Sequence, residues 1–226
     1  MRCDLVAYTP EPERVVAAAA RLCYSAIGAQ ELQERMERSD IERLIRRLSD
    51  SGHWSPFEHA SFTFAIEGVS RSLTHQLVRH RIASYSQQSQ RYVNEKSFDY
   101  IVPPTIARVP EALAEFERVM SETAAAYEKL SAMGIPREDA RYVLPNACET
   151  KIVVTMNAHG LLNFFAHRTC QRAQWEIRDL ALRMLELVRG VAPLLFEKAG
   201  PSCETEGVCR EGSHGCGRLG SVRQTD

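Results

Sequence analysis

The sequence predicts an α+β fold: a central, mostly antiparallel sheet flanked by helices in a single domain. Strand-like and helix-like segments do not alternate strictly along the chain, which disfavours a doubly wound parallel sheet. No G-x-G-x-x-G motif follows a strand-like segment, so we expect no Rossmann unit. The chain has 226 residues, of which 44% are hydrophobic and 25% charged. This composition is ordinary for a globular protein with a real core.

The first half of the chain predicts two strands and three helices. Segment 3–10 is a short strand ended by a proline, and alanine-rich segment 11–25, acidic at its start, is a helix. Segment 31–53 has apolar residues at helical spacing and Gly52 as a stop, so we expect one helix there. Alternating Phe62, Phe64 and Ile66 predict a strand over 60–68, and segment 70–81 is a short helix.

The second half predicts four helices and one strand. Segment 110–134 is a long amphipathic helix closed by Gly134, and 136–145 is a short helix between two prolines. The β-branched segment 150–158 is a strand. Segments 159–168 and 173–200 are the last two helices. We expect residues 1–200 to form the catalytic domain and residues 201–226 to form a cysteine-containing tail.

Charge and terminal composition exclude several classes of protein. The net charge of −1 disfavours a general nucleic-acid binder. The N-terminus carries charges and prolines before any apolar run develops, so it is not a signal peptide, and no stretch is apolar for the length of a membrane span. Seven cysteines without a secretory signal indicate a reducing compartment. We therefore expect a cytoplasmic protein that binds neither membrane nor nucleic acid.

Residues 79–91 concentrate hydrogen-bond donors. This stretch, RHRIASYSQQSQR, holds three arginines, one histidine, three serines and three glutamines, and no acidic residue. Arginine forks match phosphate and carboxylate oxygens, and hydroxyls and amides add neutral hydrogen bonds. A solvated basic loop is the ordinary alternative. The stretch has no lysine but keeps Ile82, Ala83 and Tyr85, which favours an anion site that packs partly against other residues.

The same stretch resembles a family signature. It fits the pattern RHR, seven residues, S, any residue, R, and is similar to the flavin-dependent thymidylate synthases (the ThyX family). Four further segments resemble that family in order: RLCYS at 21–25, GHWSPFEH at 52–59, PREDARYVLP at 136–145, and NAHGLLNFFAHRTCQRAQWEI at 157–177. The resemblance implies synthesis of dTMP from dUMP, with FAD as cofactor and methylenetetrahydrofolate and NADPH as co-substrates.

The resemblance also assigns cofactor residues. Those expected to bind FAD are Ser55, Glu58, Arg79, His80, Arg81, Ile82, Asn157, His159 and Asn163. Cationic donors suit the pyrophosphate and the electron-rich reduced ring. Some family members carry arginine at the position of His159. Glu58 is the carboxylate that we expect to offset the arginines after folding.

The resemblance further assigns the residues that hold dUMP and those that act in catalysis. The residues expected on dUMP are Gln76, Gln87, Ser89, Arg91, Arg141 and Arg168, with Arg141 reaching the phosphate from a neighbouring subunit. Arg168, His53 and Ser89 form the expected catalytic group. Arg168 would stabilise negative charge on the uracil, and His53 would lie near flavin and folate. We do not expect Ser89 to be a nucleophile, because no acid–base partner is apparent beside it.

The expected reaction is reductive methylation. Reduced nicotinamide gives a hydride to FAD, the one-carbon unit reaches C5 of dUMP, and tetrahydrofolate leaves unoxidised. Because the chain lacks a dinucleotide-binding motif, the resemblance implies FAD sites at the interfaces of a homotetramer.

We expect no metal site. His53, Glu58 and His59 match no standard zinc spacing. The tail offers Cys203, Cys209, His214 and Cys216, for which zinc is chemically reasonable, but the loops are longer than a CxxC knuckle and favour a flexible or locally packed tail.

Two functions from other classes remain open to experiment. A single-stranded RNA or nucleotide-binding module would use the arginines on phosphates and the tyrosines for stacking, with strongly salt-dependent affinity. A metal-dependent hydrolase would use the seven histidines and be inhibited by chelators. Neither accounts for all five resembling segments.

Overall fold

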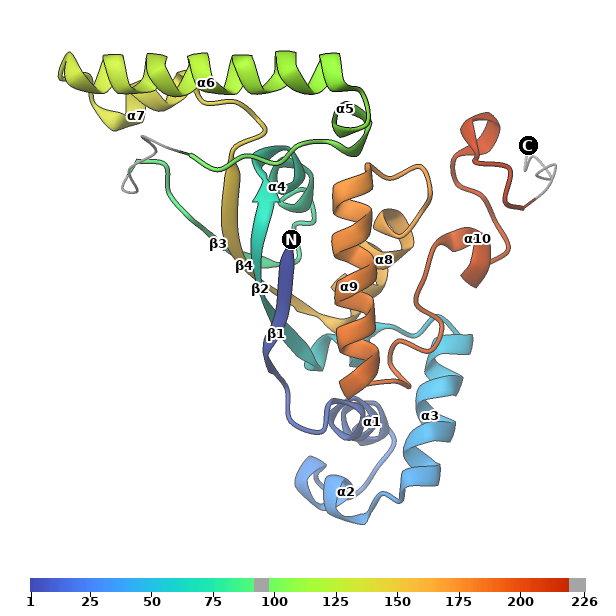
Figure 1. The fold of residues 1–226 in the computed structure, drawn as a ribbon. Helices are drawn as coiled ribbons and strands as arrows, with labels where there is room; N and C mark the ends of the chain where they lie inside the picture. Colours follow the sequence, from blue (N-terminus) through green and yellow to red (C-terminus); the bar gives the residue numbers. More distant parts are fainter. Residues whose placement is uncertain (92–97, 220–226) are drawn as a thin grey trace. The chain divides into compact units, whose positions relative to one another are not determined.

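The computed structural model describes residues 1–91 and 98–219 (Figure 1). The last two positions of the donor-rich region, Tyr92 and Val93, and residues 220–226 of the expected tail lie outside the described residues. In chain order the elements are β1 (Arg2–Tyr8), α1 (Pro12–Leu22), α2 (Ala29–Arg35), α3 (Arg38–Asp50), a 3-10 turn (Ser55–His59), β2 (Ser61–Ser70), α4 (Arg71–Leu77), β3 (Ser84–Gln87), α5 (Pro104–Ala107), α6 (Pro110–Ala132), α7 (Arg137–Ala140), a second 3-10 turn (Arg141–Val143), β4 (Glu149–Asn157), α8 (Ala158–Arg168), α9 (Trp175–Val191), α10 (Ser202–Thr205) and a third 3-10 turn (Gly212–His214).

The four strands form one antiparallel sheet in the order β1-β2-β4-β3 (Figure 1). The predicted α+β class is therefore confirmed. Side chains of β4 alternate between buried and accessible along most of the strand, and those of β2 do so from Phe62 to Ile66, which is the pattern of strands with one buried face.

The chain groups into two compact units that interleave in sequence. The first unit comprises Met1–Arg2, Ile66–Arg79 and Tyr85–Val153, and the second comprises Cys3–Ala65, His80–Ser84 and Val154–Asp226. The donor-rich stretch belongs partly to each unit. We describe each unit separately.

Each unit has an apolar core of its own. In the first unit Phe98, Met120 and Cys148 are buried together, and Tyr100, Phe116 and Leu144 pack against them. In the second unit Phe196 meets Phe62 and Phe165 edge to face, with ring centroids 5.4 and 5.9 Å apart. Helices α8 and α9 of that unit pack together and contribute a further set of fully buried residues: Leu161, Phe164, Ile177, Leu180, Ala181, Met184 and Val188.

The single helix expected over 31–53 is instead two helices, α2 and α3. Met36 and Glu37 have extended backbone, with ψ of 123° and 155°. The guanidinium of Arg14 donates to the Met36 carbonyl at 2.9 Å and so satisfies the end of α2. The apolar periodicity continues across the break, which is why sequence reasoning merged the two.

The last predicted helix, 173–200, is also shorter than expected. Helix α9 ends at Val191, because Pro193 has no N–H to continue it. Beyond it, Arg189 donates to the carbonyls of Phe196 and Ala199 at 3.2 and 2.8 Å and fixes a compact segment. Two short elements, β3 and α5, were not predicted from the sequence.

Candidate functional site

In the first unit, Gln87 is held by two buried hydroxyls. Its Nε2 donates to Thr74 Oγ1 at 2.9 Å and to Thr150 Oγ1 at 3.3 Å. Thr74 and Thr150 are each only 1% exposed. These three residues form a neutral cluster, which we call the amide–hydroxyl cluster. It fixes the direction of β3 at the point where the donor-rich stretch enters this unit.

The first unit also brings together the two arginines that the resemblance assigns to a phosphate. Glu138 pairs with the Arg91 guanidinium at 3.2 Å, and its backbone carbonyl accepts from Arg141 Nε at 3.2 Å. Sequence reasoning expected Arg141 to arrive from a neighbouring subunit, whereas here it meets Arg91 through Glu138 of its own chain. Segment 136–145 contains Glu138, but its partner could not be identified from spacing.

The other residues assigned to the nucleotide lie close to these clusters in the chain. Gln76 is on α4, where its Nε2 donates to the Ser72 carbonyl at 3.3 Å. Ser89 Oγ accepts from the Arg91 backbone N–H at 3.2 Å and so shapes the turn after β3. Tyr85 donates its hydroxyl to the Leu77 carbonyl at 2.8 Å, and burial raises the pKa of Tyr85 to about 12.

In the second unit, the 3-10 turn lies beside the start of α8. The Ala158 N–H donates to the Ala60 carbonyl at 2.8 Å, and Asn157 caps α8 by accepting from the Gly160 N–H at 2.7 Å. This placement brings Glu58 to His159, with 3.0 Å between Oε1 and Nδ1. The expectation that Glu58 offsets the arginines is wrong within the described chain, because its partner is His159.

His80 and Arg168 form the second polar contact of this unit. Arg168 Nε donates to His80 Nε2 at 3.1 Å, and the imidazole stands edge-on to Phe164 with centroids 5.0 Å apart. Burial lowers the pKa of His80 to about 4, helped by the charge of Arg168 and by His167. Burial likewise lowers the pKa of Arg168. His80 is therefore a neutral acceptor near pH 7, and the contact fixes the direction of the arginine.

Other assigned residues of the second unit are open to solvent. The Ile82 side chain is 70% exposed next to Arg81, which is also exposed. A Cβ at Gly160 would lie 3.2 Å from the Ile82 carbonyl and from Asn157 Oδ1, so glycine permits this close approach. Asn163, one turn along α8 from His159, is exposed too. An exposed apolar side chain among neutral and cationic donors suits a flat, partly apolar cofactor with a polar rim.

A cavity of about 530 Å³ in the second unit contains two further assigned residues, His53 and Ser55. Arg21, Tyr24 and Arg47 also line it, and sequence reasoning did not single them out. Within the described residues no carboxylate pairs with Arg21 or Arg47. Arg21 and Tyr24 belong to a segment whose resemblance was noted, but Arg47 stands on α3 with no sequence signal.

Among the described residues, no group of three His, Cys, Asp or Glu side chains already has the spacing of a metal centre. None of the helices in the described ranges combines the length and the apolar character that crossing a bilayer would require.

Comparison with known proteins places the chain in a family. The family model described as thymidylate synthase complementing protein matches residues 4–194. The chain belongs to this family.

Curated relatives have one name in common. A protein of Geobacter sulfurreducens named flavin-dependent thymidylate synthase is 53% identical over 226 residues, covering 99% of this chain and 97% of the relative. Proteins of the same name from Clostridium tetani and Pyrococcus furiosus are 50% and 43% identical, covering 99% and 93% of this chain and 96% and 90% of their own lengths. The resemblance found in the sequence is thus confirmed.

Proposed function

We propose that this chain is a flavin-dependent thymidylate synthase that makes dTMP. The observation that carries the proposal is the similarity to relatives of that name along almost the whole of both chains. The donor-rich stretch and the polar contacts around α8 supply the chemistry such an enzyme needs.

The proposed reaction is dUMP, methylenetetrahydrofolate, NADPH and a proton giving dTMP, tetrahydrofolate and NADP⁺. FAD, when bound, supplies the two-electron redox chemistry that this chain's side chains cannot perform. In the second unit we propose that Ser55, Glu58, His80, Arg81, Ile82, Asn157, His159 and Asn163 hold it, together with Arg79 of the first unit. The exposed Ile82 would meet the ring and the donors its rim and phosphates.

The chain's own residues bind and orient the nucleotide. Arg91 and Arg141 would grip the phosphate, with Glu138 keeping both in place until the phosphate arrives. Gln76, Gln87 and Ser89 would hold neutral oxygens and nitrogens of dUMP. His53 lies in a cavity and would contact the folate.

Arg168 is the proposed stabiliser of charge on the pyrimidine. Its permanent positive charge would offset negative charge as C5 becomes nucleophilic. His80, neutral near pH 7, holds the guanidinium without competing for that charge.

Assembly and location complete the proposal. Met133 and Tyr142 of the first unit are 65% and 84% exposed, as expected for an apolar surface covered in a homotetramer. All seven cysteines are free in the structure, in keeping with a cytoplasmic enzyme. Residues 1–200 would form the catalytic domain and residues 201–226 an appended tail.

The test is direct. The purified chain is loaded with FAD, desalted, and assayed for dTMP by mass spectrometry with each substrate omitted in turn. We expect dTMP only in the complete mixture, and flavin bands that shift with dUMP but not with RNA. Flavin that is retained but never yields dTMP would contradict the proposed reaction, and light scattering that finds a monomer retaining FAD would contradict the tetramer.

A further inference from the structure

Four of the seven cysteines line one cavity of the second unit. Cys170 follows α8, Cys203 lies on α10, and Cys209 and Cys216 lie in the tail, and together they border a volume of about 250 Å³. None of the four has a role in the proposed reaction. Three of them lie beyond residue 194, where the match to the family model ends.

The tail around this cavity has no apolar core. From Cys203 to Leu219 no residue is buried, and Val208 and Leu219 are 44% and 37% exposed. The segment nevertheless forms α10 and a 3-10 turn. A segment this short that buries so little is generally held by a cross-link or a metal ion.

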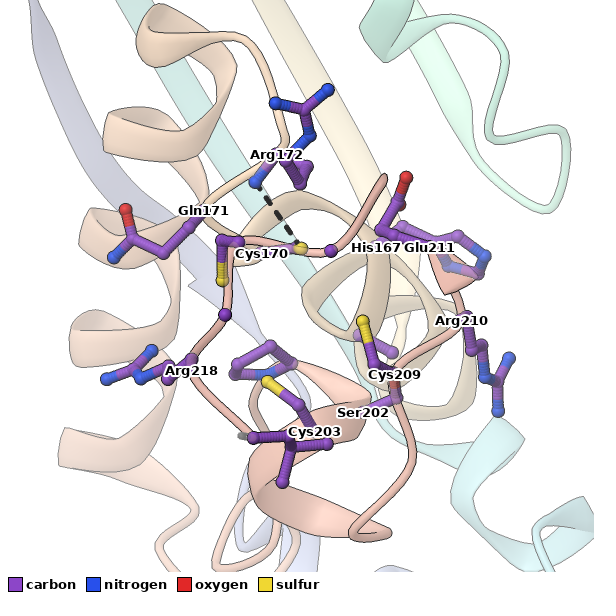
Figure 2. Close-up of a pocket in the computed structure, with 16 residues that line it drawn as sticks. His167, Cys170, Gln171, Arg172, Ser202, Cys203, Cys209, Arg210, Glu211 and Arg218 are labelled. Atoms are coloured by element: carbon purple, nitrogen blue, oxygen red, sulfur yellow. Dashed lines mark hydrogen bonds between the residues drawn. The ribbon is translucent and has the colours of Figure 1, made fainter. Parts of the chain in front are cut away.

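The charged side chains at the cavity are directed elsewhere. Figure 2 shows the guanidinium groups of Arg210 and Arg218 pointing away from the sulfurs of Cys203 and Cys209. Arg210 pairs with Glu206 at 2.8 Å and Arg218 pairs with Glu204. The cavity is therefore lined by thiols and not by free cations, which disfavours an anion as its occupant.

The backbone approaches two of the sulfurs closely. The Arg172 N–H donates to Cys170 Sγ at 3.5 Å, which Figure 2 marks with a dashed line. A Cβ at Gly215 would lie 3.1 Å from Cys209 Sγ, so only glycine allows the chain to pass there. Backbone N–H groups that donate to sulfur stabilise thiolates and orient them as metal ligands.

We propose that Cys170, Cys203, Cys209 and Cys216 bind one structural zinc ion that fastens the C-terminal tail to the loop after α8. Zinc takes four thiolates in a tetrahedral arrangement with Zn–S distances of about 2.3 Å, and each thiol loses its proton on binding. The sulfurs do not yet have that spacing in the structure, so binding draws them inward by rotation of the cysteine side chains and a shift of the tail.

The ligand set differs from the one that the sequence offered. His214 was the fourth candidate beside the three tail cysteines, but it does not border the cavity, and its Nδ1 contacts Ser213 Oγ at 3.3 Å. Cys170, distant in sequence, takes its place. Four protein ligands leave no open position, which is typical of a structural site and not of a catalytic one.

The test measures zinc in the full-length chain loaded with FAD and purified in reducing buffer without chelator. We expect about one zinc per chain by elemental analysis. Cys170→Ser and Cys209→Ser should each lower the retained zinc by roughly tenfold or more. His214→Ala and Cys23→Ser, matched controls outside the cavity, should keep it.

A second measurement uses the unmodified chain, so that it does not depend on variants that fold. In the native protein four of the seven thiols should resist alkylation until a chelator removes the zinc. The proposal is overturned if the chain binds no zinc after incubation with Zn²⁺ under reducing conditions. It is also overturned if Cys170→Ser keeps zinc while His214→Ala loses it, or if intact-mass analysis finds these cysteines in disulfides.

Discussion

The two units stabilise their polar groups by different means. In the first unit Gln87 is held by hydroxyls of Thr74 and Thr150, which do not titrate in the physiological range. In the second unit the key contacts join His159 to Glu58 and His80 to Arg168, and each includes a histidine. The residues assigned to dUMP are thus held mostly by neutral bonds, whereas those around α8 respond to pH and salt.

The largest expected effect tests the charge in the second unit. Arg168→Ala should lower kcat/KM for dTMP formation by about 10²–10³-fold, because it removes a fixed charge from the reacting ring. Steady-state kinetics at saturating FAD measures this. Arg183→Ala is the control, since Arg183 on α9 is exposed and pairs with Asp179. An Arg168→Ala enzyme as active as the control would contradict the assigned role.

Next in size is the amide–hydroxyl cluster. Gln87→Ala should cost about 1–3 kcal/mol in the free energy of unfolding, because it leaves the buried Thr150 hydroxyl without its donor. The loss should be the same from about pH 5 to pH 8, since no member titrates there. Urea unfolding measures it, and the control is Gln88→Ala, whose side chain has no hydrogen bond within the described residues. A cost that varies strongly with pH would show that the neutral description of the first unit is wrong.

A smaller effect should appear in the second unit as pH falls. The pKa of His80 is about 4 in the folded chain and near its ordinary 6.5 when unfolded, so unfolding takes up a proton between these values. The resulting stability is present above about pH 6.5 and is lost progressively as pH falls toward 4.

This is measured by comparing His80→Gln, which keeps an acceptor for Arg168, with the wild type. Between pH 7 and pH 5 the wild type should lose about 1 kcal/mol more than the variant, after allowance for partial exposure. His167 and Arg168, the charged neighbours of His80, are the same in both proteins. Parallel losses in the two proteins would mean that His80 is not held neutral.

The smallest effect concerns the pair of Glu58 and His159. The two side chains are 51% and 39% exposed, so Glu58→Gln should change stability by only about 0.2–1 kcal/mol. The change should shrink further at high salt. Thermal unfolding at low and high ionic strength measures it against Glu186→Gln, an exposed residue of α9. A large, salt-independent loss would show that the pair is more than a surface contact.

Sequence and structure agree best where the signal is local. Alternating phenylalanines predicted β2, and the helix between Pro110 and Gly134 was predicted within two residues. They differ where a remote group intervenes. Arg14 closes α2 and so separates it from α3, and Pro193 with Arg189 turns the expected last helix into a compact segment. Such contacts join residues that are far apart in the chain, and periodicity carries no information about them.

The sequence by itself determined the class of fold, most of the helices and strands, and the family, because these depend on short-range periodicity and on residues at fixed spacing. Only the tertiary structure decided the partners. It paired Glu58 with His159 instead of an arginine, brought Arg91 and Arg141 to Glu138, and placed Cys170 at the same cavity as three tail cysteines. The physical reason is that hydrogen bonds, ion pairs and metal ligands depend on distances in space. Those distances are set by how the cores pack and not by separation along the chain.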